Sequence, residues 1–312
     1  MKIAAVVVTY NRLNLLKECI NAIRNQTHRV DDIIVVNNSS TDGTLEWLEE
    51  QKDLTVITQE NLGGAGGFYT GIKTAYEKGY DWIWCMDDDA EPKKDALEEL
   101  SLHSTGKDVV ALGCSVVSPS GNIAINHRAK ISLKQCFPSI LVPLDSKEYQ
   151  KRVVEIDAAS FVGLFIKRDA IKNIGFPKIE FFINYDDIEY CIRLRSVGKI
   201  LLIPSSVIVH KEAAKRWINK NFLGRESPRV EFHKFWLSYY IVRNFVWLGK
   251  RHSEDKTLFY FQMVKSMVRY IFGIVLYDDN KYRRLRLVLN AYADGLRGKF
   301  DNEKPKRILY KK

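Results

Sequence analysis

Three consecutive carboxylates, Asp87, Asp88 and Asp89, are the residues of this 312-residue chain whose spacing points most directly to chemistry. Adjacent acids repel one another, so they are tolerated on a solvated turn or beside a divalent cation that neutralises them. They follow an uncharged run, Trp82 to Met86, which is typical of a buried strand. Ligands bind at the carboxyl ends of strands in open α/β sheets. A polar loop that only caps the strand is the commoner explanation for an isolated triple of acids. The rest of the chain must therefore show whether these acids form a ligand site.

A second acidic pair and a later histidine offer further candidate groups. Asp186 and Asp187 precede apolar residues at helical spacing that run from Ile188 to Leu194. The dipole of a helix stabilises carboxylates at its amino end, and simple N-capping explains the pair equally well. His210 follows an apolar run, and a single histidine in that place is more often structural than a ligand. Neither group by itself identifies a site.

A glycine cluster lies between a predicted strand, 54–58, and a predicted helix, 68–78. It comprises Gly63, Gly64, Gly66 and Gly67. It is not a dinucleotide fingerprint, because Tyr69 stands where the third glycine should be, and no Gly-Lys-Ser/Thr follows as in a P-loop. What remains is a flexible loop whose backbone N–H groups can approach a ribose or a phosphate closely. A plain turn explains the cluster equally well.

These groups fall in the loops of a regular alternation of strands and helices. The predicted strands are 3–8, 33–36, 54–58 and 82–86, and the predicted helices between them are 13–25, 44–51 and 68–78. Such alternation favours an α/β fold with a mostly parallel sheet and helices on both faces. The loops TYNR, NNSSTDGT, NLGGAGG and DDDAEP would then gather along one edge, where a mononucleotide fits. Pro92 is expected to stop strand pairing directly after the acids.

The remainder of the chain is less regular. We expect strands at 109–117 and 200–203, one or two strands within 153–168, and a hairpin or an excursion at 120–152. Residues 230–249 and 258–277 combine aromatic and basic side chains and are predicted helices. Helices packed on the core explain this composition. An aromatic and basic surface that lies on an anionic membrane is the alternative.

Composition limits the classes of partner. The net charge of +10 indicates an anionic partner, which is a nucleic acid, an acidic lipid or a phosphorylated ligand. No zinc finger or RNA-binding aromatic motif supports nucleic acid. Five cysteines without CxxC spacing argue against a zinc site and a disulfide framework, and fit a reducing cytosol. The first residues are typical of a strand rather than a signal peptide, and no run of ~18 uncharged apolar residues predicts a transmembrane helix.

The order of these motifs resembles that of family 2 glycosyltransferases with a GT-A fold. The matching pieces are VVVTYNR, IIVVNNSSTDGT, ENLGGAGGF, WCMDDDAEP, YDDIEYCIRLRSVG and the later His210, which cover residues 3 to about 212. NLGGAGGF with MDDDA is most similar to the galactofuranosyltransferase branch, and YYIVRN and LNAYADGLRGKF resemble the tails of rhamnosyl- and galactofuranosyltransferases. The resemblance implies a GT-A catalytic domain at 1–212. It also implies a helical, basic and aromatic region at 213–312 for the acceptor or a membrane.

The resemblance also implies roles for individual residues. Asp87 and Asp89 match the carboxylates that hold Mn²⁺ or Mg²⁺ on the donor diphosphate, and His210 matches a third ligand used by some members. Asp187 matches the general base, with Asp186 beside it. The implied nucleotide-binding residues are Thr9, Tyr10, Arg12, Asn38, Asn61, Gly63, Gly64, Gly66, Gly67 and Asp88. Many members carry Asp where this chain has Asn37, which leaves uridine and thymidine open.

The implied function is inverting, metal-dependent transfer from UDP-galactofuranose or dTDP-rhamnose to a cell-surface glycan on a lipid carrier. One positioned base without a second nucleophilic carboxylate implies direct displacement. The expected location is the cytoplasm, including the inner face of the membrane. A nucleotidyltransferase is one alternative, but the loop TYNRLN offers only Arg12 for a triphosphate. A non-catalytic nucleotide- or membrane-binding module is the other. Oligomeric state, acceptor and linkage stay open.

Overall fold

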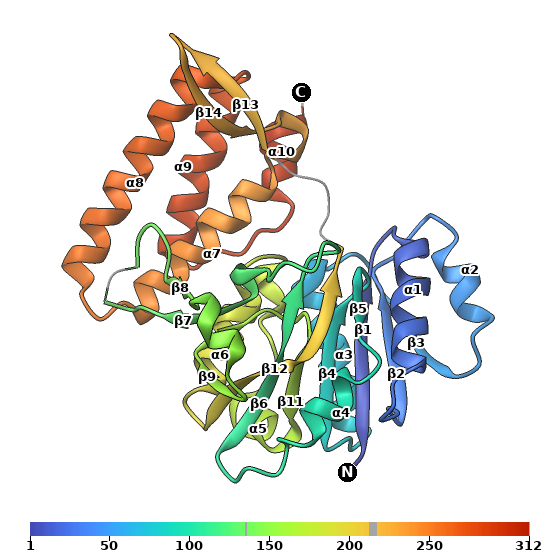
Figure 1. Cartoon of the computed structure of the whole chain (residues 1–312). Helices are drawn as coiled ribbons and strands as arrows, with labels where there is room; N and C mark the ends of the chain where they lie inside the picture. Colours follow the sequence, from blue (N-terminus) through green and yellow to red (C-terminus); the bar gives the residue numbers. More distant parts are fainter. Residues whose placement is uncertain (135, 212–216, 312) are drawn as a thin grey trace. The chain divides into compact units, whose positions relative to one another are not determined.

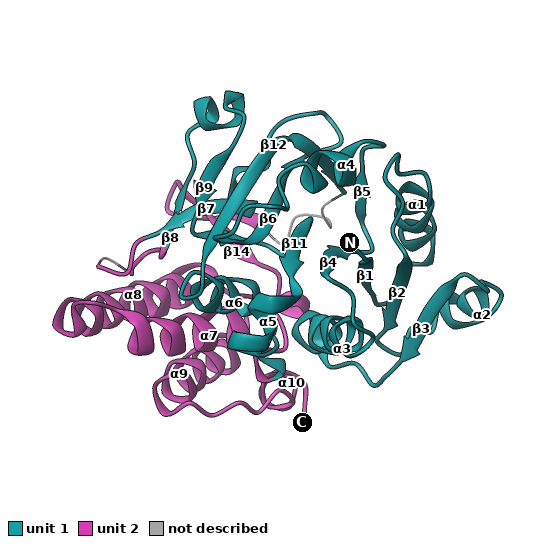
Figure 2. Cartoon of the chain, turned by 90° about the horizontal axis from the view of Figure 1, so that it is seen from below, with its two compact units in different colours: residues 1–131, 141–179, 186–212 teal, residues 132–140, 180–185, 213–312 magenta. Residues whose placement is uncertain are grey.

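The computed structural model describes residues 1–134, 136–211 and 217–311. The chain forms two compact units (Figure 2). Unit 1 comprises residues 1–131, 141–179 and 186–212, and unit 2 comprises 132–140, 180–185 and 213–312. Two short segments from the first two thirds of the chain therefore belong to unit 2. The boundary expected at 212/213 lies outside the described residues.

Unit 1 is built on a nine-stranded sheet, in the order β3-β2-β1-β4-β11-β6-β12-β5, with β9 also paired to β12 (Figure 1). Its strands are β1 Ile3–Thr9, β2 Asp32–Asn37, β3 Leu54–Thr58, β4 Trp82–Asp87, β5 Ala90–Pro92, β6 Val109–Val117, β9 Val154–Ile156, β11 Leu164–Lys167 and β12 Lys199–His210. Strands β1, β2, β3, β4, β6 and β12 run parallel, whereas β5, β9 and β11 run opposite. This confirms the expected mostly parallel sheet flanked by helices.

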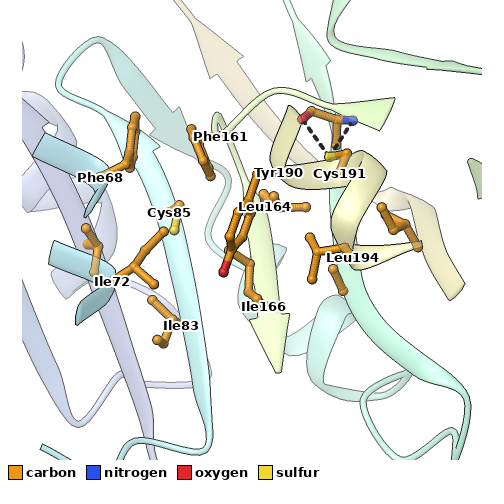
Figure 3. Packing of buried hydrophobic residues seen from close by; sticks show 14 of the residues in the cluster. Phe68, Ile72, Ile83, Cys85, Phe161, Leu164, Ile166, Tyr190, Cys191 and Leu194 are labelled. Carbon is orange, nitrogen blue, oxygen red and sulfur yellow. Dashed lines mark hydrogen bonds between the residues drawn. The ribbon is translucent and has the colours of Figure 1, made fainter. Parts of the chain in front are cut away.

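Helices cover both faces of this sheet because its central strands are apolar on both sides. The helices are α1 Leu13–Arg24, α2 Thr44–Glu49, α3 Gly63–Glu77, α4 Ala96–Ser101, α5 Arg168–Ile174 and α6 Asp186–Leu194. Alternate residues of β1 enter two separate cores, one shared with α3, α5 and α6 and the other with α1, α2 and α4. Figure 3 shows the first core, where Phe68 of α3 stacks on Phe161.

Helix α3 begins five residues earlier than the sequence predicts. The glycine cluster forms its first turns instead of a flexible loop before it. A Cβ at Gly67 would lie 2.3 Å from Val8 Cγ1, and one at Gly71 would lie 2.3 Å from Val6 Cγ1. These glycines therefore let α3 lie directly on β1, which outweighs the poor helix propensity of glycine.

Residues 120–167 leave the sheet and return to it. A three-stranded sheet forms from β7 Arg128–Ile131, β8 Leu141–Pro143 and β10 Ala158–Ala159, next to the short 3₁₀ helices η1 Ile125–His127 and η2 Ser146–Gln150. The excursion predicted at 120–152 is therefore confirmed. The one or two strands predicted within 153–168 are three, since β9, β10 and β11 are separate. Gly163, with φ +75°, lies directly before β11.

The structure extends two expectations near the sheet edge. Residues 90–92 still pair after the acids, because β5 runs antiparallel to β12 with Pro92 opposite Ile208, and β5 ends at Pro92. A proline is tolerated here because β5 is an edge strand. The strand predicted at 200–203 and the apolar run before His210 form one strand, β12, which continues through an irregularity between Ile203 and Val207.

Unit 2 is mainly helical. Its helices are α7 Leu237–His252, α8 Lys256–Tyr277, α9 Lys281–Arg297 and α10 Lys304–Tyr310, with the short 3₁₀ helix η4 Phe232–Lys234 before α7. A hairpin of β13 Trp217–Phe222 and β14 Arg225–Val230 precedes them, and the sequence did not predict it. Among the described residues, α8 is the one helix long and apolar enough to cross a membrane by length and composition. Lys265 and Arg269 lie in its middle.

Candidate active site

Asp88 joins the loop after β1 to the loop after β4. It is buried, and its Oδ2 accepts hydrogen bonds from Thr9 Oγ1 at 2.8 Å and from the Tyr10 backbone N–H at 3.4 Å. Arg12 Nη1 donates to Asp88 Oδ1 at 3.3 Å and to Asp89 Oδ2 at 2.7 Å. Both loops follow parallel neighbouring strands, so they meet at the carboxyl edge of the sheet. The structure thus brings together four residues of the predicted nucleotide-binding set.

The sheet edge also brings His210 to the acidic triple. His210 is the last residue of β12 and lies opposite Ala90 of β5, directly after Asp89. Its Nε2 lies 2.9 Å from Asp89 Oδ1. Ligand atoms of Asp87, Asp89 and His210 all lie within 4.8 Å of one another. These three side chains form the cluster that we call the acidic triad.

The acidic triad holds more negative charge than its protein surroundings neutralise. Burial and the neighbouring charge of Asp89 raise the pKa of Asp87 to about 7. Burial raises the pKa of Asp88 to about 6, although Arg12 and Thr9 oppose this shift. Burial alone would raise the pKa of Asp89 as well, but the hydrogen bond and charge of His210 lower it below its usual range. A cation at the triad would relieve the repulsion between Asp87 and Asp89.

Asp186 and Asp187 begin α6, as expected. Asp187 Oδ1 accepts a hydrogen bond from the Ile188 backbone N–H at 2.7 Å, a local bond at the start of the helix. Burial raises the pKa of Asp187 to about 6, and burial together with the charge of Asp187 raises the pKa of Asp186 well above its ordinary value. The charge of Asp87 also raises the pKa of Asp186, so the two acidic clusters act on each other electrostatically.

A network of side-chain hydrogen bonds holds the loops after β1 and β2. Asn11 Oδ1 accepts from the Thr41 backbone N–H at 2.6 Å, and Asp42 Oδ2 accepts from the Leu13 backbone N–H at 2.9 Å. Residues 11–15 and Asp42 line an open pocket of about 450 Å³. Asp42 was not among the predicted site residues, although its place in the polar loop after a strand could have indicated it.

Asn38 and Asn61 shape the start of α3. Asn38 is buried, donates from Nδ2 to the Gly63 carbonyl at 3.1 Å and accepts from Gln59 Nε2 at 2.8 Å. Asn61 Oδ1 accepts from the Gly63 backbone N–H at 3.0 Å. Gly66 and Gly67 are buried in the helix, while a Cβ built on Gly64 would meet no atom within 4 Å beyond its chain neighbours and the backbone of its own helix. In this structure the predicted binding residues of this segment make contacts that position the helix.

His127 is a candidate site residue that sequence reasoning missed. Its ring lies edge-on to the ring of His210, with 5.0 Å between centroids, and its Nδ1 lies 2.7 Å from Ser160 Oγ. The next residue, Arg128, is fully buried and donates to the backbone carbonyls of Cys114 and Val162. The excursion at 120–160 therefore adds an imidazole beside the acidic triad. The sequence holds no periodic signal for this, because the contact depends on the path of an irregular segment.

Comparison with known proteins agrees with this geometry. Residues 4–175, more than half of the chain, match the profile described as Glycosyl transferase family 2. The chain belongs to this family. A galactofuranosyltransferase of Mycolicibacterium smegmatis is 29% identical over 203 residues, which cover 63% of this chain and 66% of that enzyme, slightly under two thirds of its length. A dTDP-rhamnosyl transferase of Shigella flexneri is 25% identical over 95% of this chain and 96% of its own length.

Solved structures share the fold of this family member. The structure of Staphylococcus aureus TarS (residues 1–349) in complex with UDP has a TM-score of 0.58 at 13% identity, over 99% of this chain and 83% of that one. A mannosyltransferase of Pyrobaculum calidifontis, in complex with GDP-mannose and Mn²⁺, has a TM-score of 0.52 at 16% identity, over 95% of this chain and 75% of that one. At this level of identity they show the fold alone.

The residues of the acidic triad fit the divalent cation that the fold family implies. Carboxylate oxygens suit both Mn²⁺ and Mg²⁺, and one imidazole nitrogen is a common addition for a transition metal such as Mn²⁺. The three ligand atoms are close enough to contact one ion, and burial together with the charge of Asp89 raises the pKa of Asp87, a shift that a bound ion would oppose. His210 Nε2 lies 2.9 Å from Asp89 Oδ1, so these two side chains already face each other.

Proposed function

We propose that this protein transfers a sugar from a nucleoside diphosphate donor to a glycan acceptor, with inversion at the anomeric carbon and with a divalent cation held by Asp87, Asp89 and His210. The observation that carries this proposal is the acidic triad, three ligand atoms within 4.8 Å at the carboxyl edge of the sheet in a family 2 glycosyltransferase chain. Partly buried carboxylates arranged in this way are costly to keep unless they bind a cation.

The residues around the triad suit binding of a diphosphate. When bound, a divalent cation supplies neutralisation of the negative charge that builds on the leaving diphosphate. Arg12 lies beside Asp88 and Asp89 and adds a fixed positive charge at the same place. Its contacts with Asp88 also hold the loop after β1, next to the pocket of residues 11–15. In our proposal this loop and the loop after β2 hold the nucleoside.

Asp187 is the proposed general base. The oxygen of the acceptor hydroxyl forms a bond to the anomeric carbon while the bond from that carbon to the diphosphate breaks. The hydroxyl proton moves to Asp187, and the nucleoside diphosphate leaves. A pKa of about 6 suits this role, because the carboxylate is ionised at neutral pH and still basic enough to take the proton. One base and direct displacement give inversion.

The donor sugar that we favour is galactofuranose, and rhamnose is next. The galactofuranosyltransferase relative supports the first through its similarity over 203 residues of this chain. The dTDP-rhamnosyl transferase relative supports the second, since its similarity extends over 95% of the chain. We propose a cell-surface glycan on a lipid carrier as the acceptor. We also propose that the protein works in the cytoplasm at the inner face of the membrane.

Release of nucleoside diphosphate tests the proposal. The donors are UDP-galactofuranose, dTDP-rhamnose, UDP-galactose and UDP-glucose, each with Mn²⁺ and with EDTA, in the presence of a lipid-linked glycan extract. Asp187→Asn is the test variant. Asp95→Asn, an exposed acid at the start of α4 without a side-chain cap hydrogen bond, is the matched control. We expect metal-dependent release from one donor, lost in Asp187→Asn and kept in the control.

Other outcomes would change the assignment. Release that EDTA does not affect would contradict the role of the acidic triad. Metal-dependent nucleotide binding without turnover of any donor would favour a non-catalytic binding module. Formation of a nucleotide sugar from a nucleoside triphosphate and a sugar phosphate would identify a nucleotidyltransferase.

A further inference from the structure

Helix α8 carries an apolar face that the described residues of unit 2 do not cover. The helix buries Phe259, Met263 and Ile274 on one side. Its exposed apolar residues are Tyr260, Phe261, Val264, Val268, Phe272, Val275 and Leu276, and all of them except Tyr260 lie on the opposite side. Phe261 and Phe272 are 67% and 61% exposed. We call this side the outer face of α8. Contiguous apolar surface of this kind on a protein marks a place of interaction.

Contacts at both ends and along the buried side hold α8 in this orientation. Asp255 caps the helix by accepting from the Leu258 backbone N–H at 2.8 Å. Phe137 packs edge-on to Phe245 and against Phe259, and its backbone N–H donates to Gln262. After the last turn, Asp278 is buried and receives two hydrogen bonds from Arg229, at 2.6 and 2.9 Å. Rotation of α8 to bury its outer face would break these contacts within unit 2.

The charges of α8 have one sign. The helix contains Lys256, Lys265 and Arg269 and no Asp or Glu. At 100° per residue, Lys265 and Arg269 lie along one edge of the outer face, next to Phe272 and Leu276. Both bases are exposed. A partner for this face therefore needs an apolar interior and negative charge at its border.

We propose that the outer face of α8 lies in the surface of an anionic lipid bilayer, with the aromatic and branched side chains at the boundary between headgroups and acyl chains. Lys265 and Arg269 then lie at the level of the lipid phosphates. An in-plane amphipathic helix with aromatic residues on one side and bases at the border has this geometry. The inference rests on the proposed function, since binding to the membrane would bring the enzyme to its proposed lipid-linked acceptor.

Two other occupants fit this face less well. A second copy of the chain would bring the bases of two α8 helices to one contact without any carboxylate of α8 to pair with them. Insertion across the bilayer would place Lys265 and Arg269 in hydrocarbon and would require α8 to leave the partners of Phe259 and Asp278. The bilayer surface accepts the apolar residues and the bases together.

Co-sedimentation of the full chain with vesicles tests the inference. The vesicles are phosphatidylcholine with and without phosphatidylglycerol, at low and high salt. The test variant is Phe261→Ser with Phe272→Ser. The control is Leu102→Ser, an apolar residue of unit 1 that is 67% exposed, as Phe261 is. We expect wild type and control to bind the anionic vesicles and the double variant to bind at least about tenfold more weakly.

Charge reversal gives a second test that does not change the apolar surface. Lys265→Glu with Arg269→Glu should weaken binding to anionic vesicles about tenfold or more and leave any binding to neutral vesicles unchanged. Absence of wild-type binding to every vesicle, or equal binding by all variants, would overturn the inference. A dimer in solution that the Phe261 and Phe272 substitutions dissociate would assign the face to a second copy instead. Vesicle binding needs no turnover, so its failure is distinct from failure of the glycosyl transfer assay.

Discussion

Two charged side chains, Arg243 in unit 2 and Asp87 in unit 1, have different surroundings. In unit 2, Arg243 is fully buried and donates to Asn244 Oδ1, Asn302 Oδ1 and the carbonyls of Glu180 and Phe181. In unit 1, burial raises the pKa of Asp87 to about 7. Repulsion from Asp89 and Asp88 raises it as well, and the positive charges of His210 and Arg12 only partly offset these effects. The protein thus supplies hydrogen-bond acceptors for Arg243, whereas the neighbouring carboxylates of Asp87 repel its charge.

This difference separates charges that hold the fold from charges that await a ligand. A buried donor with all its partners in place stabilises the folded state, and its removal leaves those partners unsatisfied. A carboxylate held among like charges destabilises the unliganded protein, and the same repulsion favours the binding of a cation. Variants of the two kinds should therefore affect stability in opposite directions.

The largest expected effect is on catalysis by Asp187→Asn. Loss of the base should lower the rate of transfer by about 10²–10⁴-fold. The melting temperature of the protein without metal should not fall, because the substitution removes a partly buried charge whose pKa burial raises. Steady-state kinetics and thermal melts measure the two quantities on the same sample. A clear drop in melting temperature would make Asp187 a structural residue and would contradict the distinction between charges that stabilise the fold and charges that serve the site.

Arg243→Met should lower the stability of the protein, which Asp187→Asn should not do. It removes the donor for two side-chain oxygens and two backbone carbonyls, so we expect the free energy of unfolding to fall by about 3 kcal/mol or more. Urea denaturation measures this. Arg286→Met, at an exposed arginine of α9, is the control and should change stability by less than about 0.5 kcal/mol. Equal effects of the two substitutions would contradict the role given to Arg243.

Metal binding should stabilise unit 1 through the acidic triad. At a Mn²⁺ concentration of about 100 times its Kd, the folded state gains about 2.7 kcal/mol. Asp89→Ala removes one of the three ligands and should abolish most of this gain, while Asp95→Ala should keep it. Thermal melts over a Mn²⁺ titration give the result without any assay of turnover. The same metal-induced shift in wild type and Asp89→Ala would refute the ligand role of Asp89.

The smallest expected effect is the pH dependence of the base. Asp187 acts when it is ionised, so kcat/KM should rise with pH up to about 6 and fall about tenfold per pH unit below that value. The free energy of unfolding depends on pH in the opposite direction. The folded state holds this proton more tightly than the unfolded chain, so the contribution of Asp187 to stability is lost as pH rises from about 4 to about 6. A pH–rate profile that is flat between 4 and 7 would exclude Asp187 as the titrating group.

Several features followed from the sequence because they depend on local pattern. The uncharged run before Asp87 predicted β4, and the alternation of apolar runs with polar loops predicted the first four strands of a mostly parallel sheet. Asp186 and Asp187 were expected at the start of a helix, and α6 begins there. Residue types and their distance along the chain are sufficient for such features, since strand and helix periodicity act over a few residues.

Other features depended on which segments meet. His210 reaches Asp89 because β5 pairs with β12, and His127 reaches His210 through the path of an irregular excursion. The start of α3 follows from its close approach to β1 at Gly67.

Helices α7 and α8 have the same mixture of aromatic and basic residues. Tyr239, Tyr240 and Arg243 of α7 are buried, while Phe261 and Phe272 of α8 are exposed. Local sequence therefore determined the acidic loops and the strands before them. Only tertiary packing decided which charges share one site and which aromatic helix faces solvent, because burial depends on residues distant in the chain.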